Sequence, residues 1–302
     1  MHILATEGLT KRFPTVTAID ALTVTVGPGV TGLVGANGAG KSTLIKILLG
    51  LLPPSGGAAQ VLGLDIAAQG AEIRRLVGYM PEHECLPPDV SATELVVHFA
   101  RMSGLPRVAA RERAADVLRH VGLAEERYRA IGGYSTGMKQ RVKLAQALVH
   151  DPKLIFLDEP TNGLDPRGRD EMLTLIKRIG AEFGISVLVT SHLLGELERV
   201  CDHVIVIDAG RLLRSSAIGE YTQGTQSVTV EVDEGLDDLA ARLAAAGQTA
   251  SRQGRMLVVK VAGPETYDLI RDTAVDLDLC LIRLEEGRHR IEDVFREEIT
   301  HV

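Results

Sequence analysis

The chain has 302 residues, 45% of them hydrophobic and 24% charged, which is enough for one large domain or two unequal ones. Its formal net charge of −7 shows no basic excess, so we expect no nucleic-acid partner. Cys85, Cys201 and Cys280 lie far apart, which indicates reduced thiols in a cytoplasmic protein. The first residues lack a signal-peptide pattern, and the apolar run 47–52 is far shorter than the roughly 18 residues that span a bilayer. We therefore expect a soluble chain that reaches a membrane only through a partner.

Short apolar segments alternate with amphipathic helical patterns, which favours an α/β fold with a largely parallel core sheet. The expected strands are residues 30–35, 77–82, 153–159, 185–191 and 203–208. The expected helices are residues 41–50, 91–102, 107–121 and 167–180. Ser91 and Glu94 have capping-box spacing and mark the start of the second helix. The stretch from about 84 to 150 is mainly helical, and we expect it to form a lobe beside the sheet.

The pattern weakens at the polar segment 214–226, which predicts a linker between a domain of residues 1–215 and a small α+β domain of residues 216–302. The second domain is expected to contain a split βαβ arrangement. Its expected elements, in chain order, are strand 227–232, helix 236–247, strand 256–261, helix 264–275, strand 279–285 and helix 291–299.

A glycine-rich stretch, GANGAGKST, lies between the first expected strand and the first expected helix. It matches the pattern GxxxxGK[ST], in which backbone N–H groups cradle phosphates, the lysine reaches the β- and γ-phosphates and the hydroxyl binds Mg²⁺. The alternative, a glycine-rich turn without function, is disfavoured by the strand and helix on either side. The residues expected at the nucleotide are Gly35, Asn37, Gly38, Gly40, Lys41, Ser42 and Thr43.

Two adjacent carboxylates, Asp158 and Glu159, end the expected strand 153–159. Such a pair is often only a solvated strand end, but with a phosphate loop present Asp158 is expected to bind Mg²⁺ together with Ser42. Glu159 is expected to orient or deprotonate the attacking water. His192 follows the next apolar strand and is expected at the same sheet edge, although on its residues alone a structural role is equally well supported.

A second glycine motif, YSTGMKQR at residues 134–141, opens a helical pattern and by itself indicates a capped helix start. In the order GANGAGKST, YSTGMKQR, LIFLDEPTNGLDP and Ser191–His192, however, the chain resembles the nucleotide-binding domain of ATP-binding cassette (ABC) proteins over about 215 residues. The resemblance implies a P-loop NTPase fold that binds ATP and Mg²⁺. It also implies that two ATPase domains pack head to tail, so that Ser135 and Gly137 contact ATP held by the partner.

The same resemblance assigns four further positions. Phe13 matches the aromatic residue that stacks on adenine, and His192 matches the switch histidine that reaches the γ-phosphate. Asp165 matches a loop along the dimer interface. Glu82 stands where the family normally has Gln, which contacts Mg²⁺ and the attacking water. Its added negative charge leaves two consequences open, which are stronger metal binding and altered coupling to a transport partner.

The resemblance implies a Mg²⁺-dependent ATPase subunit that dimerises on ATP and drives a separate transmembrane permease, with export favoured. The permease is expected near Glu82 and residues 84–100, which places the chain at the cytoplasmic face of the membrane. The second ATPase subunit is either another copy or a different chain. One alternative is a soluble ABC ATPase that acts on ribosomes or DNA, which the single uninterrupted domain and the acidic balance disfavour. The other is a nucleotide-binding regulator without turnover, which the presence of Glu159 disfavours.

Overall fold

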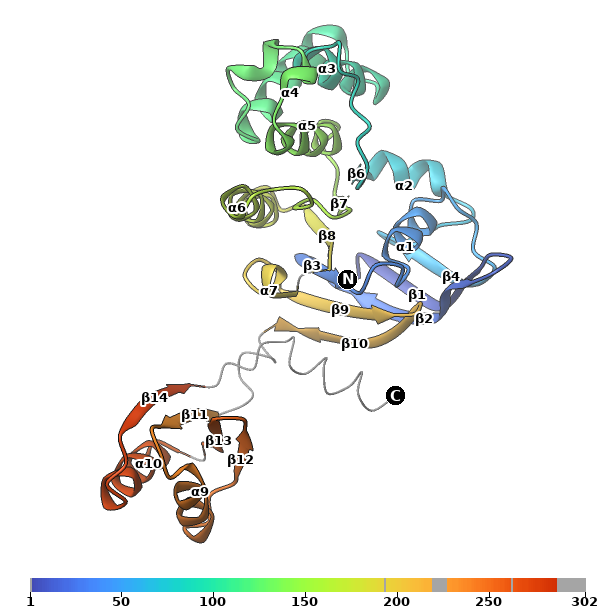
Figure 1. The fold of residues 1–302 in the computed structure, drawn as a ribbon. Helices are drawn as coiled ribbons and strands as arrows, with labels where there is room; N and C mark the ends of the chain where they lie inside the picture. Colours follow the sequence, from blue (N-terminus) through green and yellow to red (C-terminus); the bar gives the residue numbers. More distant parts are fainter. Residues whose placement is uncertain (1, 193, 219–226, 262, 287–302) are drawn as a thin grey trace. The chain divides into compact units, whose positions relative to one another are not determined.

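The structure is a computed structural model and describes residues 2–192, 194–218, 227–261 and 263–286. The chain divides into two compact units, residues 1–218 and 219–302, which are described separately below (Figure 1). Within the described ranges, the helices are too short or too polar for any of them to cross a membrane.

A six-stranded sheet forms the centre of the first unit. β9 and β10 pair antiparallel, and the other neighbours pair parallel. Every position of β3, β7 and β8 is buried, as expected for parallel strands covered on both faces. All five expected strands form, which confirms the largely parallel sheet. The strands in spatial order are β10 (Arg211–Ala217), β9 (His203–Asp208), β3 (Val30–Val34), β8 (Ser186–Ser191), β7 (Leu154–Leu157) and β6 (Val77–Met80).

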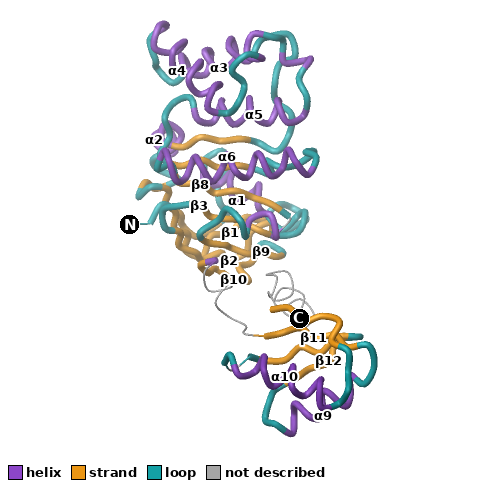
Figure 2. The backbone as a smooth tube through the Cα atoms, turned by 90° about the vertical axis from the view of Figure 1, so that its left-hand side faces the viewer, coloured by secondary structure: helices purple, strands orange, loops and turns teal. Residues whose placement is uncertain are grey.

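A second, antiparallel sheet was not expected from the sequence. Its order is β2 (Thr17–Val26), β1 (Leu4–Arg12), β4 (Gly56–Val61) and β5 (Leu64–Asp65). It shares one hydrophobic core with the main sheet and with α1 (Lys41–Leu48), and α2 (Gly70–Leu76) packs beside it. The fully buried side chains of this core include Leu9, Ile19, Leu33, Ile45 and Phe156. α6 (Pro166–Phe183) lies on the other face of the main sheet, opposite α1, as Figures 1 and 2 show together.

A helical lobe gathers beyond the β6 edge of the main sheet (Figure 1). It consists of α3 (Ala92–Met102), α4 (Arg107–His120) and α5 (Thr136–Leu148), with the short turns η1 (Glu126–Tyr128) and η2 (Ile131–Gly133). The capping box forms as predicted, because Glu94 N–H donates to Ser91 Oγ and Ser91 N–H donates to the Glu94 carboxylate. α5 packs against both other lobe helices and against β6 and β7, so it joins the lobe to the sheet.

The second unit is an antiparallel sheet with two helices. Its strands lie in the order β12 (Ala250–Gln253), β13 (Met256–Lys260), β11 (Ser227–Val232) and β14 (Leu281–Glu286), and its helices are α9 (Leu236–Ala245) and α10 (Glu265–Asp276). β13 and β14 flank β11, both antiparallel to it, and α10 connects them, so a split βαβ arrangement is present. β12 was not expected. β10 includes residues 214–217 of the expected linker, while residues 219–226 and the expected helix 291–299 lie outside the described residues.

Candidate functional site

The phosphate loop connects β3 to α1, and its conformation depends on glycine. Gly38 has a φ of 88° and Gly40 a φ of 104°, a region that L side chains rarely adopt. A Cβ on Gly40 would lie 2.3 Å from the carbonyl oxygen of Ala18. Gly40 is also the N-cap of α1 and supplies no side-chain cap, so the first-turn amides of the helix are left for another acceptor.

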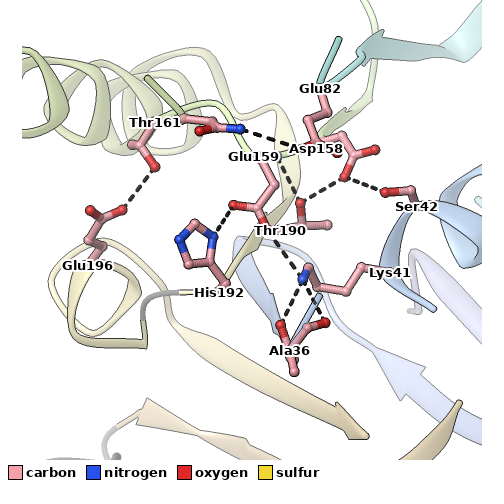
Figure 3. Close-up of polar contacts among 12 residues, drawn as sticks. Ala36, Lys41, Ser42, Glu82, Asp158, Glu159, Thr161, Thr190, His192 and Glu196 are labelled. Atoms are coloured by element: carbon pink, nitrogen blue, oxygen red, sulfur yellow. Dashed lines mark hydrogen bonds and ion pairs between the residues drawn. The ribbon is translucent and has the colours of Figure 1, made fainter. Parts of the chain in front are cut away.

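Lys41 lies at the mouth of this loop and is only 6% exposed. Its Nζ donates to the carbonyl oxygen of Gly35 at 2.7 Å and of Ala36 at 3.3 Å, and it lies 3.3 Å from Glu159 Oε1 (Figure 3). A buried ammonium held by carbonyls and one carboxylate is a strong local positive charge for an anionic ligand.

A cavity of about 340 Å³ opens above the loop. Six of the seven residues expected at the nucleotide line it, together with Glu82 and Glu159. The seventh, Gly35, begins the loop and packs against β9, where a Cβ would lie 2.5 Å from the Ile207 carbonyl oxygen. The lining residues are Ala18, Ala36, Asn37, Gly38, Gly40, Lys41, Ser42, Thr43, Glu82 and Glu159.

Asp158 follows β7 and is almost fully buried. Its Oδ1 accepts hydrogen bonds from Ser42 Oγ at 3.2 Å and from Thr190 Oγ1 at 3.0 Å (Figure 3). Thr190, which is completely buried on β8, was not predicted as a site residue. Burial, and next the Asp158 charge, raise the pKa of Tyr79 on β6, a second neighbour that the sequence did not indicate. The carboxylate of Asp158 is therefore held beside the Ser42 hydroxyl.

These oxygen groups are of the type that binds Mg²⁺. In the described part of the chain, His, Cys, Asp and Glu side chains nowhere form a group of three or more that would hold a metal ion alone. A cation at Ser42 and Asp158 would therefore complete its coordination with phosphate and water oxygens, as Mg²⁺ usually does at nucleotide sites. The donor set fits that cation.

Glu159 follows Asp158 with a φ of 49°, a left-handed conformation that non-glycine residues adopt at a cost and mostly at functional sites. Its N–H donates to Thr190 Oγ1 at 2.8 Å, and its Oε2 lies 2.9 Å from Nδ1 of His192. Its Oε1 is buried and accepts no hydrogen bond within the described chain, although the Lys41 ammonium is close. The structure thus brings Lys41, Glu159 and His192 together, with acceptor capacity left for a water molecule.

Glu82 lies at the rim of the cavity, just beyond β6. Its Oε1 accepts a 3.4 Å hydrogen bond from Nδ2 of Asn162. Phe13 is 40% exposed, with the Lys11 ammonium 5.3 Å from its ring centroid, and it does not line the cavity. The metal contact of Glu82 and the adenine contact of Phe13 therefore stay predictions.

Ser135, Gly137 and Asp165 line a different cavity, of about 510 Å³. Ser135 is the N-cap of α5 and accepts a 3.3 Å hydrogen bond from the N–H of Met138, so the capped helix start is present. Asp165 caps α6 in the same way, accepting from Gly168 N–H at 3.0 Å. Within one chain, the structure does not bring this second glycine motif into the cavity of the Lys41 loop.

The sequence is similar to known proteins along almost its whole length. YdbJ of Bacillus subtilis (strain 168), described as an uncharacterized ABC transporter ATP-binding protein, is 34% identical over 299 residues, which cover 99% of this chain and 96% of YdbJ. The chain belongs to the ABC transporter ATP-binding proteins. The family profile described as ABC transporter matches residues 19–162, which contain both glycine motifs and the Asp158–Glu159 pair of this ABC protein.

Other similar proteins of the family support the same fold. The daunorubicin/doxorubicin resistance ATP-binding protein DrrA of Streptomyces peucetius is 38% identical over 218 residues, which cover 72% of this chain and 66% of DrrA. The solved structure of cbiO1 from Clostridium perfringens, part of the ABC transporter complex cbiONQ, has a TM-score of 0.67 and 28% identity, and covers 82% of this chain and 97% of cbiO1. The ABC-type P-loop NTPase fold and ATP binding are thereby confirmed.

Proposed function

We propose that this chain is the Mg²⁺-dependent ATPase subunit of an ABC exporter. The observation that supports this best is the cavity lined by the Lys41 loop, by Ser42 and by Glu159, with Asp158 hydrogen-bonded to Ser42. Lys41 would contact the terminal phosphates, and the nucleotide would displace its present contact with Glu159. Ser42 and Asp158 would hold Mg²⁺, with Glu82 at the rim as a further ligand, and the cation would neutralise charge on the phosphates.

The catalytic residues of this proposal are Glu159 and His192. Glu159 Oε1 would orient or deprotonate the attacking water, because it is a buried acceptor that lines the cavity. His192 holds the other oxygen of this carboxylate at 2.9 Å and would contact the γ-phosphate from the same side. Phosphoryl transfer needs mainly positioning and charge neutralisation, which these groups supply.

The separation of the two cavities supports a dimer of ATPase domains. Ser135 and Gly137 open α5, where free backbone N–H groups and the helix dipole favour an anion, but they lie outside the cavity of their own phosphate loop. We propose that they contact the γ-phosphate held by a second ATPase subunit, either an identical or a different chain. Asp165, in the same cavity, would lie along that interface.

The transport partner would be a separate transmembrane permease, docked near Glu82 and residues 84–100. DrrA is described as a resistance protein, and its similarity supports export. The chain would then lie at the cytoplasmic face of the membrane, with residues 1–215 as the ATPase domain and residues 216–302 as an accessory domain. Co-purification with the permease tests this, because a soluble ABC ATPase with a non-transport partner would not follow the membrane fraction.

The variant Glu159→Gln tests the enzymatic proposal. It is expected to retain ATP affinity while turnover falls by about a hundredfold or more, because the amide cannot accept a proton from water. ATP-dependent dimers should accumulate in sedimentation experiments. Glu182→Gln, on the exposed face of α6, is the matched control and should leave both properties unchanged. Wild-type turnover in Glu159→Gln would refute the assignment.

A further inference from the structure

A lysine is buried in the middle of α5, where its charge is not required by the helix. Lys143 is only 4% exposed, and its Nζ donates a 3.0 Å hydrogen bond to the backbone carbonyl oxygen of Glu82. Lysine is almost never fully buried unless it is paired, because removal of an ammonium from water costs several kcal/mol. The burial of Lys143 therefore calls for a compensating environment.

Acidic groups supply that environment. Burial has the largest effect and lowers the pKa of Lys143, while Cys85, Asp158, Glu82 and Glu84 oppose this shift by favouring its charged form. Glu82 lines the nucleotide cavity, and Asp158 is hydrogen-bonded to Ser42, which also lines it. The buried ammonium thus lies among negative charges that would otherwise oppose an incoming polyphosphate.

Two neighbours of Lys143 on α5 contact the same region. The ammonium of Lys139 pairs with the carboxylate of Glu84. Nε2 of Gln140 donates to the Asn162 carbonyl oxygen at 3.1 Å, and Asn162 in turn donates to the Glu82 carboxylate. Both the backbone and the side chain of Glu82 are consequently connected to α5, the helix that has Ser135 as its N-cap.

We propose that Lys143 is a positioning residue of the nucleotide site, which holds the Glu82 loop at the rim of the cavity and neutralises the carboxylate of Glu82. Glu82 and Lys143 then function as one pair, and the glutamate is tolerated next to bound phosphates because a buried cation lies behind it. Loss of the cation alone leaves an excess negative charge at the rim and releases the loop. Loss of both charges restores the charge balance but still releases the loop, because Lys143 donates to the backbone of residue 82. This inference rests on the ATP binding of the proposed function.

The test is a binding titration with the full chain. Because the chain has no Trp, binding of a fluorescent N-methylanthraniloyl ATP in the presence of Mg²⁺ is followed by the anisotropy of the probe. Lys143→Met preserves the length of the side chain and is expected to weaken binding about tenfold, within the range for residues of one network. In the Glu82→Gln background the same substitution should weaken binding by less than roughly threefold. Lys143→Arg should bind the probe within roughly threefold of wild type.

The control is Lys177→Met, which removes an exposed lysine from α6 and should leave the affinity unchanged. A purely structural role would make the effect of Lys143→Met independent of residue 82, so equal losses in both backgrounds overturn the proposal. The proposal is also overturned if Lys143→Met binds the probe with the same affinity as wild type. Failure of wild type itself to bind the probe would instead refute the proposed function. Circular dichroism of each variant verifies that it is folded. If Lys143→Met does not fold, Lys143→Gln is measured in both backgrounds, and equal losses or an unchanged affinity overturn the proposal in the same way.

Discussion

The hydroxyl of Thr190 is predicted to hold the acidic end of β7 in place. It accepts from the N–H of Glu159 at 2.8 Å and donates to Asp158 Oδ1 at 3.0 Å, and the residue is completely buried. Thr190→Val removes both hydrogen bonds and preserves the shape of the side chain. The Glu159 amide is then left without its acceptor, and Asp158 Oδ1 retains the hydrogen bond from Ser42.

The expected loss can be estimated from these two bonds. An unsatisfied buried amide costs about 1–3 kcal/mol, and a hydrogen bond to a charged group contributes about 1.5–3 kcal/mol. Since Ser42 still donates to Asp158, we expect a total of about 2–4 kcal/mol for Thr190→Val. Thr190→Ser retains the hydroxyl and loses one buried methyl group, which costs about 1 kcal/mol. Hydrogen bonding therefore predicts that the Val variant is the less stable of the two.

The free energy of unfolding is measured by urea denaturation monitored by circular dichroism, with hydrogen exchange of the peptide that contains residues 154–161 as the local probe. The Glu159 amide should exchange faster in Thr190→Val than in Thr190→Ser. ATP turnover should fall in the Val variant about tenfold or more, because Asp158 is no longer held in one orientation. If the Ser variant is less stable than the Val variant, packing and not hydrogen bonding determines this site, and the reasoning is refuted.

Three further predictions concern separate parts of the first unit. Lys41→Ala should weaken ATP binding itself, measured by probe anisotropy, and an unchanged affinity would contradict the phosphate-loop assignment. Ser135→Arg in the Glu159→Gln background should spare ATP binding by the single chain and abolish ATP-dependent dimers in sedimentation; persistence of dimers would exclude the shared site. Burial lowers the pKa of His150 below its usual value of about 6.5. The folded state therefore binds its proton less well than the unfolded state, so stability should decline as the pH falls below about 6.5, and His150→Gln should reduce this slope in urea denaturation; an equal slope would argue against it.

The parallel sheet could be predicted because its strands are covered on both faces. A segment such as residues 154–157, buried at every position, appears in the sequence as a continuous apolar run between helical patterns. β1 and β2 contain polar residues between their buried ones, and register shifts interrupt their pairing. β1 lacks a clear period of two, but β2 alternates between exposed and buried positions from Ala21 to Val26, a strand signal that could have predicted this part of the antiparallel sheet.

A site residue could be predicted from the sequence where it belongs to a short local motif. Lys41 and Ser42 belong to one short motif, and Asp158 and Glu159 end one strand, so spacing along the chain was sufficient. Thr190 is a common strand residue, and nothing in its neighbourhood distinguishes it. Its role appears only when parallel pairing places β8 next to β7 and brings its hydroxyl between the two carboxylate residues.

The contact between Glu82 and Lys143 could not be predicted from the sequence. The position of Glu82 in the sequence marks the residue as unusual, but the lysine that donates to its backbone carbonyl oxygen lies 61 positions away, on α5. Neither Lys143 nor Glu82 has a pattern that indicates the other, because the pair forms only when α5 packs against the end of β6. Of the two consequences that the sequence left open, stronger metal binding can be measured on the chain itself. Glu82→Gln removes the carboxylate proposed to bind Mg²⁺, while Lys143 still holds the loop through the backbone carbonyl oxygen of residue 82. It should therefore weaken Mg²⁺-dependent binding of the probe, and an unchanged affinity would show that the side chain is not a metal ligand.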